Sequence, residues 1–166
     1  RCLSDWSSDV CSSDLFCADL NRLDYVTRRQ GVDVTETLDT TEKFIVATVD
    51  AALAAQNAAI AAEANGLGIV YIGGIRNNSE QVATLLELPA KVYPVFGMCL
   101  GYPAQDPDLK PRLPMSCVYF ENHYPDLETI ADDLEQYDQR VKNYYIQRTK
   151  GKRQETWSEI MVKTLA

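Results

Sequence analysis

The sequence has little positive charge and almost no histidine. Its 166 residues include 16 lysines and arginines against 24 aspartates and glutamates, so the formal net charge is -8 at pH 7. A protein that binds nucleic acid needs a basic face for the phosphates, and this class is therefore not predicted. His123 is the single histidine and lies in a polar segment. Neither a Ser-His-Asp triad nor an HExxH metal site is predicted around it.

Paired cysteines are also lacking. The five cysteines are odd in number and include no CxxC pair, which argues against a disulfide framework and against a structural zinc site. Three of them lie in apolar runs, where a free thiol packs as a small hydrophobic group. These features predict a reducing, cytoplasmic setting. The five are Cys2, Cys11, Cys17, Cys99 and Cys117.

Long apolar runs are absent as well. The longest uncharged stretch near the middle, residues 51–62, is shorter than the roughly 20 residues that cross a membrane, so no membrane partner is expected. The start of the chain lacks the basic and apolar regions of a signal peptide. Residues 1–14 are rich in Ser and Asp, and SDWSSD is nearly repeated as VCSSDL. We interpret them as a leader that is either disordered or non-native, and residues 15–166 as the domain.

From Leu15 onward, short apolar runs alternate with helical patterns. This order predicts an α+β domain. Strands are predicted at residues 15–18, 68–74, 92–103 and 115–122. Helices are predicted at residues 41–65, 78–88, 127–148 and 155–165, with a loop or irregular helix at residues 21–34.

The strongest predicted element is the helix at residues 41–65. Thr40 or Thr41 can cap its start. The pattern favours a core helix, although its many alanines would also allow close approach of a second helix at a subunit interface. Its apolar positions recur at spacings of four and seven and are Ile45, Val49, Leu53 and Ile60.

Two short motifs could contact a ligand. The strand at residues 68–74 ends in Tyr71-Ile72-Gly73-Gly74, and glycine lets a backbone approach a flat ligand closely. The alternative is a plain strand-to-helix turn. Lys110-Pro111-Arg112 would place two cations on one side of an extended loop, which suits a phosphate. The alternative here is a solvated surface loop.

A third motif is the densest basic cluster of this acidic chain, at the end of the helix at residues 127–148 and in the following loop. Cations near a helix C-terminus are favoured electrostatically, which is one explanation. The other is a site for an extra phosphate, such as the 2′-phosphate of NADPH. The cluster consists of Arg148, Lys150, Lys152 and Arg153.

Read together, three strings resemble the oxygen-insensitive, NADPH-dependent nitro/flavin reductases of the nitroreductase superfamily. They are AAQNAAIAAEANGLGIVYIGGIRNN, LLELPAKVYPVFGMCLGYPAQDPDLKPRLP and YYIQRTKGKRQETWSE, and the resemblance covers about Leu15 to Ala166. It implies an α+β fold with a mixed sheet flanked by helices. It also implies an intertwined homodimer that holds FMN at the subunit interface, with the long alanine-rich helix in that interface.

The resemblance also implies roles for the motifs. Tyr71, Ile72, Gly73 and Gly74 would lie along the flavin ring, and Arg76 near the mouth of the site. Lys110, Pro111 and Arg112 would reach the FMN phosphate. Arg148 and Arg153 would bind the 2′-phosphate of NADPH. The implied reaction is ping-pong: hydride passes from NADPH to the flavin, and two electrons then pass to a small-molecule acceptor such as a nitroaromatic, a quinone or free flavin.

Two family features have no counterpart here. The family's N-terminal basic, serine-containing FMN motif is missing because family-like sequence begins at Leu15, and its C-terminal arm is missing beyond Ala166. We therefore expect an N-terminally truncated chain that alone binds FMN weakly. The alternative function is a non-catalytic, acidic helical domain that dimerises through the helix at residues 41–65.

Overall fold

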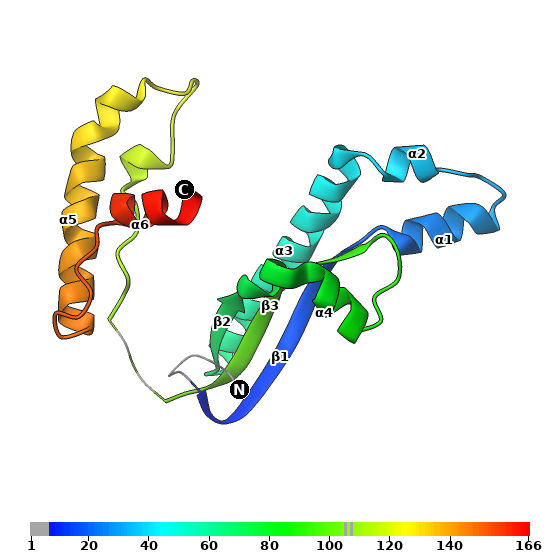
Figure 1. Ribbon diagram of the computed structural model, residues 1–166, viewed down its shortest axis with the longest axis horizontal. Coiled ribbons are helices and arrows are strands. Elements are labelled where there is room, and N and C mark those ends of the chain that lie inside the picture. The colour runs from blue at the N-terminus through cyan, green and yellow to red at the C-terminus, as the bar shows by residue number, and fades with distance from the viewer. Residues whose placement is uncertain (1–6, 105, 107) are drawn as a thin grey trace. The chain divides into compact units, whose positions relative to one another are not determined.

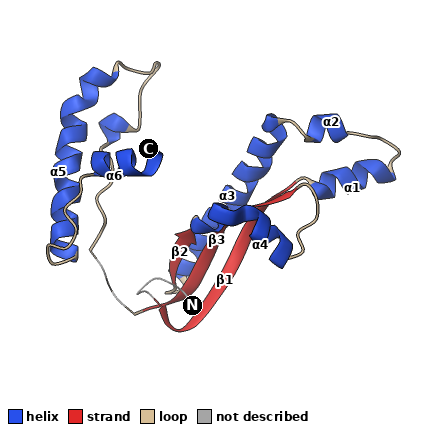
Figure 2. Ribbon diagram, in the orientation of Figure 1, coloured by secondary structure: helices blue, strands red, loops and turns tan. Residues whose placement is uncertain are grey.

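The computed structural model describes residues 7–104, 106 and 108–166. The chain divides into two compact units, Arg1–Asp106 and Pro107–Ala166, and each is described by itself. The first contains a sheet with its helices, and the second is helical, as Figures 1 and 2 show.

The sheet of the first unit has the strand order β1-β3-β2. Its strands are β1 (Ser7–Asp19), β2 (Gly68–Ile72) and β3 (Val92–Pro103). Both pairings are antiparallel, so the expectation of a mixed sheet is wrong for the strands that the structure describes. Phe16 pairs with Phe96 and Cys17 with Pro94. Val95 is therefore an extra residue on β3, which makes a β-bulge.

Residues 7–14 form the first part of β1 and pair with β3. The interpretation of residues 1–14 as a leader that is either disordered or non-native stays a prediction, and residues 1–6 lie outside the described part. In β1, β3 supplies backbone hydrogen bonds to a segment whose sequence shows no strand pattern.

Helix α3 (Thr41–Ala64) is confirmed, and Thr40 caps it by accepting a hydrogen bond from the backbone N–H of Lys43. The four aliphatic positions identified from the sequence do not face the sheet. Leu53 is 61% exposed, whereas Ala55 is 0% exposed, and α3 packs against β1, β2 and β3. The aliphatic stripe (Ile45, Val49, Leu53, Ile60) is two residues out of phase with the buried alanine stripe, on nearly the opposite side of the helix. The alanine stripe consists of Ala47, Ala51, Ala55, Ala59 and Ala62.

By length and composition alone, α3 could also cross a membrane. The expectation that no segment would be long enough to cross a membrane is therefore wrong with respect to length, because α3 extends beyond the uncharged residues 51–62. Such a helix is weak evidence, since core helices of soluble proteins pass the same test. Here one side of α3 packs on the sheet.

The shorter helices of this unit follow local signals. They are α1 (Asn21–Arg29), α2 (Thr35–Leu38), the 3₁₀ turn η1 (Gly74–Asn78) and α4 (Ser79–Leu85). Asn78 caps α4 by accepting from the N–H of Gln81. Helix α4 ends before the predicted Leu88, because Glu87 adopts φ +52° and the Leu88 N–H turns back to the Ala83 carbonyl at 2.9 Å.

The second unit contains two turns, η2 (Met115–Cys117) and η3 (Leu127–Ile130), and two helices, α5 (Ala131–Arg148) and α6 (Trp157–Leu165). The strand predicted at residues 115–122 is wrong. No other strand lies in the described part of this unit, so the N–H groups of Cys117, Val118 and Tyr119 bond locally to Pro114 and Met115. Tyr137 of α5 meets Trp157 of α6 edge-on, with ring centroids 5.8 Å apart.

Candidate functional site

The glycine turn of the first unit follows β2 as predicted. Tyr71 is partly exposed; its hydroxyl donates to Gln56 at 3.4 Å and its ring meets Phe96 edge-on at 5.5 Å. Gly73 and Gly74 follow, and a Cβ placed on Gly74 would meet no atom within 4 Å. The backbone at Gly74 is therefore open to a flat ligand.

Arg76 has a structural role that the sequence did not predict. Its Nη1 donates to the carbonyl oxygen of Val95 at 2.6 Å, at the bulge of β3. A Cβ on Gly73 would lie 3.2 Å from Arg76 Nη2, so the guanidinium covers the first glycine of the turn. Because β2 ends at Ile72, opposite Gly97, Arg76 fixes the turn to β3 beyond the last strand pair.

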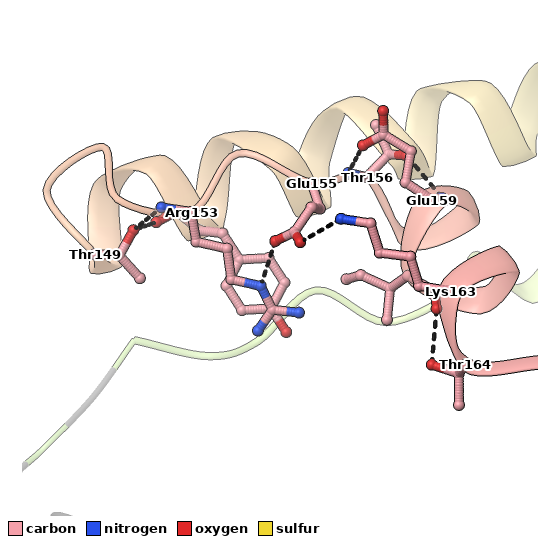
Figure 3. Close-up of polar contacts among 9 residues, drawn as sticks. Thr149, Arg153, Glu155, Thr156, Glu159, Lys163 and Thr164 are labelled. Atoms are coloured by element: carbon pink, nitrogen blue, oxygen red, sulfur yellow. Dashed lines mark hydrogen bonds and ion pairs between the residues drawn. The ribbon is translucent and has the colours of Figure 1, made fainter.

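The basic loop of the second unit is built on a reversal after α5. Lys150 and Gly151 both have positive φ, +52° and +81°, and the Gly151 N–H bonds to the Ile146 carbonyl at 2.8 Å. The Thr149 hydroxyl donates to the Tyr145 carbonyl at 2.7 Å and accepts from the Arg153 N–H at 2.8 Å. One hydroxyl thus fixes the start of the returning chain over the last turn of α5 (Figure 3).

Arg153 is held on two sides. The carbon of its guanidinium lies 3.9 Å from the centre of the Tyr145 ring, a cation–π distance. Its Nε donates to Glu155 at 2.9 Å, and the same carboxylate accepts from Lys163 Nζ at 2.9 Å (Figure 3). Hydrogen bonds from Lys163 and Arg153 hold the pKa of Glu155 below its ordinary value. Glu155 is therefore ionised at neutral pH.

Two more predicted cations meet the same aromatic pair. Tyr144 and Tyr145 contact each other with ring centroids 5.3 Å apart. Arg148 Nη1 donates to the Tyr144 hydroxyl at 2.7 Å, and Lys110 Nζ lies 5.9 Å from the Tyr145 ring centre. The structure therefore brings Lys110, Arg148 and Arg153 together around two tyrosines.

The loop motif Lys110-Pro111-Arg112 is only partly ordered by contacts. The Pro111 carbonyl accepts from the Tyr137 hydroxyl at 3.4 Å, which fixes the loop to α5. Arg112 is exposed and forms no hydrogen bond or ion pair with the described residues. A paired clamp of Lys110 and Arg112 stays a prediction.

The sequence patterns did not identify Tyr144, Tyr145, Glu155 or Lys163 as site residues. The available signal was the charge pattern, because Glu155 follows Arg153 by two residues and precedes Lys163 by eight. Tyr71, Ile72, Gly73, Gly74 and Arg76 lie in the first unit, and the other predicted residues lie in the second.

A groove of about 730 Å³ lies elsewhere in the first unit, between β1, α1 and α3. Most of its lining is apolar, including Leu15, Phe16, Val26 and Val46, and none of the predicted site residues lines it. Cys17 also lines it, and burial, with a smaller contribution from Asp19, raises the pKa of its thiol. This thiol is a poor nucleophile at neutral pH, in keeping with its predicted packing role.

Comparison with known proteins yields matches along both units. Residues 29–102 match the profile described as "Nitroreductase family", and residues 110–166 match "Nitroreductase family, C-terminal domain". The chain is 47% identical over 146 residues to the "FMN reductase (NADPH)" of Bacillus subtilis (strain 168), covering 87% of this chain and 59% of that protein. It is 46% identical over 151 residues to the "Oxygen-insensitive NADPH nitroreductase" of Salmonella typhimurium, covering 91% and 60%. The chain thus spans about three-fifths of the length of these curated relatives.

Solved structures match as well. The chain resembles NfrA1 of B. megaterium with a TM-score of 0.87 and 47% identity, over 92% of this chain and 62% of that one. It resembles the NADPH:FMN oxidoreductase from Vibrio harveyi complexed with NAD+ with a TM-score of 0.67 and 36% identity, over 96% and 75%. These matches confirm the α+β, nitroreductase-like fold, and the chain belongs to the nitroreductase family.

Proposed function

We propose that the protein is an NADPH-dependent flavin oxidoreductase that binds FMN and reduces small-molecule acceptors such as nitroaromatics, quinones or free flavin. The observation that carries the proposal is the Arg153 guanidinium, stacked on Tyr145 at 3.9 Å with Arg148 and Lys110 at the same tyrosine pair. The relatives' names, FMN reductase (NADPH) and oxygen-insensitive NADPH nitroreductase, support it.

The residues of the second unit fit the phosphates of NADPH. A phosphate monoester carries close to two negative charges at neutral pH and accepts bidentate hydrogen bonds from a planar guanidinium. Arg153 and Arg148 offer such donors in a chain that is otherwise acidic. Arg148 at the end of α5 and Arg153 in the following loop also gain the favourable interaction of cations with a helix C-terminus.

The residues of the first unit fit a flat ring. The open backbone at Gly74 and the partly exposed ring of Tyr71 offer a surface against which a flat ring can lie. Tyr71, Ile72, Gly73 and Gly74 would orient the ring, while Arg76 keeps the turn in place through Val95. FMN, when bound, supplies the chemistry by accepting hydride from NADPH and returning two electrons to the acceptor. Lys110, Pro111 and Arg112 would bind its phosphate.

The aliphatic stripe of α3 supports a homodimer. Ile45, Val49, Leu53 and Ile60 are each about half exposed or more on a helix whose other side is buried against its own sheet. A second copy of the chain would bury them. The absence of paired cysteines supports a cytoplasmic setting. A dimerisation domain without catalysis is not favoured, because it leaves the cations at the tyrosine pair without a ligand.

Binding measurements on the purified chain test the proposal. NADPH should bind more tightly than NADH, and Arg153→Ala or Arg148→Ala should weaken NADPH binding by roughly ten- to a hundredfold, the value of one charge-assisted hydrogen bond. NADH binding should change little. Arg140→Ala is the matched control. Arg140 lies on α5, as Arg148 does, but it contacts the ring of Tyr137 and not the Tyr144–Tyr145 pair. Equal losses for NADPH and NADH would remove the two arginines from a phosphate-binding role.

A further inference from the structure

We propose that Glu155 is a positioning residue that orients Arg153 for a terminal phosphate monoester, and thereby sets the preference for a phosphorylated over an unphosphorylated adenine dinucleotide. The proposal rests on the proposed function and deepens it. Glu155 has no place in the predicted site, and as an acid beside a phosphate site it would ordinarily be counted as unfavourable.

The geometry supports positioning because Glu155 uses only one edge of the guanidinium. Its Oε2 accepts from Arg153 Nε at 2.9 Å, while the two η nitrogens form no hydrogen bond or ion pair with the described residues. The stack on Tyr145 sets the plane of the group, and Thr149 fixes the Arg153 backbone. The remaining edge, Nη1 and Nη2, is thus held in one plane and one direction (Figure 3).

The charges near Glu155 limit its repulsion of an anion. Lys163 Nζ lies 2.9 Å from the other carboxylate oxygen, Oε1, so Glu155 is placed between two cations. Its lowered pKa keeps the carboxylate ionised in the neutral range. The guanidinium stays oriented there, while much of the negative charge of Glu155 is balanced by Lys163.

Pre-orientation matters because an arginine side chain loses considerable rotamer freedom when it binds a ligand. A side chain already fixed in its bound conformation does not have to lose that freedom on binding. A phosphate monoester can accept two parallel hydrogen bonds from an oriented η edge, and an unmodified ribose hydroxyl cannot. The benefit of orientation therefore falls on the phosphorylated ligand alone.

Charge and orientation predict opposite effects of Glu155→Gln. By charge alone, removing an anion from the site should strengthen phosphate binding. By orientation, it should weaken binding, because the neutral amide holds Arg153 Nε less firmly. Calorimetry can measure the binding of adenosine 2′,5′-bisphosphate and of adenosine 5′-monophosphate to the full 166-residue chain. We expect Glu155→Gln to weaken the bisphosphate roughly tenfold, the order of one charge-assisted hydrogen bond, and to leave the monophosphate unchanged.

Two further variants complete the experiment. Glu135→Gln removes one carboxylate from the exposed side of α5 without touching Arg153, and should leave both ligands unchanged. Glu155→Asp keeps the charge and withdraws the carboxylate by one methylene, so it should give an intermediate loss even if Glu155→Gln folds poorly. The Nε–H resonance of Arg153 in NMR spectra should lose its protection from exchange in Glu155→Gln and keep it in Glu135→Gln.

The outcomes separate the two proposals. Unchanged or tighter bisphosphate binding in Glu155→Gln, in a chain whose wild type prefers the bisphosphate, would overturn the positioning role and leave the proposed function intact. A wild type that binds both ligands equally would overturn the proposed function together with the positioning role. A selective loss in Glu155→Gln, with an intermediate loss in Glu155→Asp, would support both.

Discussion

Replacing Ala55 by leucine should destabilise the first unit, although leucine is the more hydrophobic residue. Ala55 is 0% exposed at the centre of the buried alanine stripe, and α3 packs there against the sheet. Three additional carbon atoms have no free volume, so overpacking should cost about 1–3 kcal/mol of the free energy of unfolding. The matched change, Ala52→Leu, adds the same atoms on the exposed side and should stay within about 0.5 kcal/mol of the wild type.

Urea unfolding followed by circular dichroism measures both free energies. A glycine pair provides a second comparison. Ala52→Gly should cost about 1 kcal/mol from helix propensity, and Ala55→Gly about 0.8 kcal/mol more because it also removes a buried methyl. If Ala52→Leu proved as destabilising as Ala55→Leu, the alanine stripe would not be the packed side of α3. The aliphatic stripe would then be the core face that the sequence pattern suggests.

Two more predictions concern the same unit. Leu53→Lys should shift the chain from dimer to monomer in sedimentation experiments, because it places a charge within the exposed aliphatic stripe. An unchanged dimer in Leu53→Lys would refute the interface. Arg76→Met should lower the free energy of unfolding by about 1.5–3 kcal/mol, since it removes a charge-assisted bond to the Val95 carbonyl. Arg22→Met, which breaks only an exposed ion pair with Asp19, should cost about 1 kcal/mol or less, and equal losses in the two arginine variants would argue against a special role for Arg76.

The sequence predicts elements well where local chemistry decides them. Thr40 caps α3 as expected, and β3 spans the predicted residues 92–103. The orientation of α3 could not be predicted in this way, because alanines and larger aliphatics both form apolar stripes. Which stripe packs inward depends on how closely the sheet approaches. The strand expected at residues 115–122 failed for a related reason, since a strand requires a partner that the composition of the segment does not specify.

In the candidate site, too, some residues could be predicted from the sequence and others could not. Its cations were predictable, because Lys and Arg are few and clustered in an acidic chain. Their partners were not, because Tyr145 reads as an apolar helix position and Glu155 as an ordinary surface acid. Only the reversal at Lys150 and Gly151 brings Arg153 back over Tyr145. The position of an arginine can thus be read from sequence, whereas the direction in which its donors point depends on backbone geometry several residues away.

The bulge at Val95 affects both the pairing of β3 with β1 and the turn after β2. Side chains alternate between the two faces of a strand, so an unmatched residue shifts the alternation relative to the neighbouring strand by one position. Pro94 and Val95 are both buried. Deleting Val95 would make the pairing of residues 92–94 with β1 continuous with that of Phe96. It would also remove the carbonyl that anchors Arg76, so a change of one residue in chain length would alter two distant segments together.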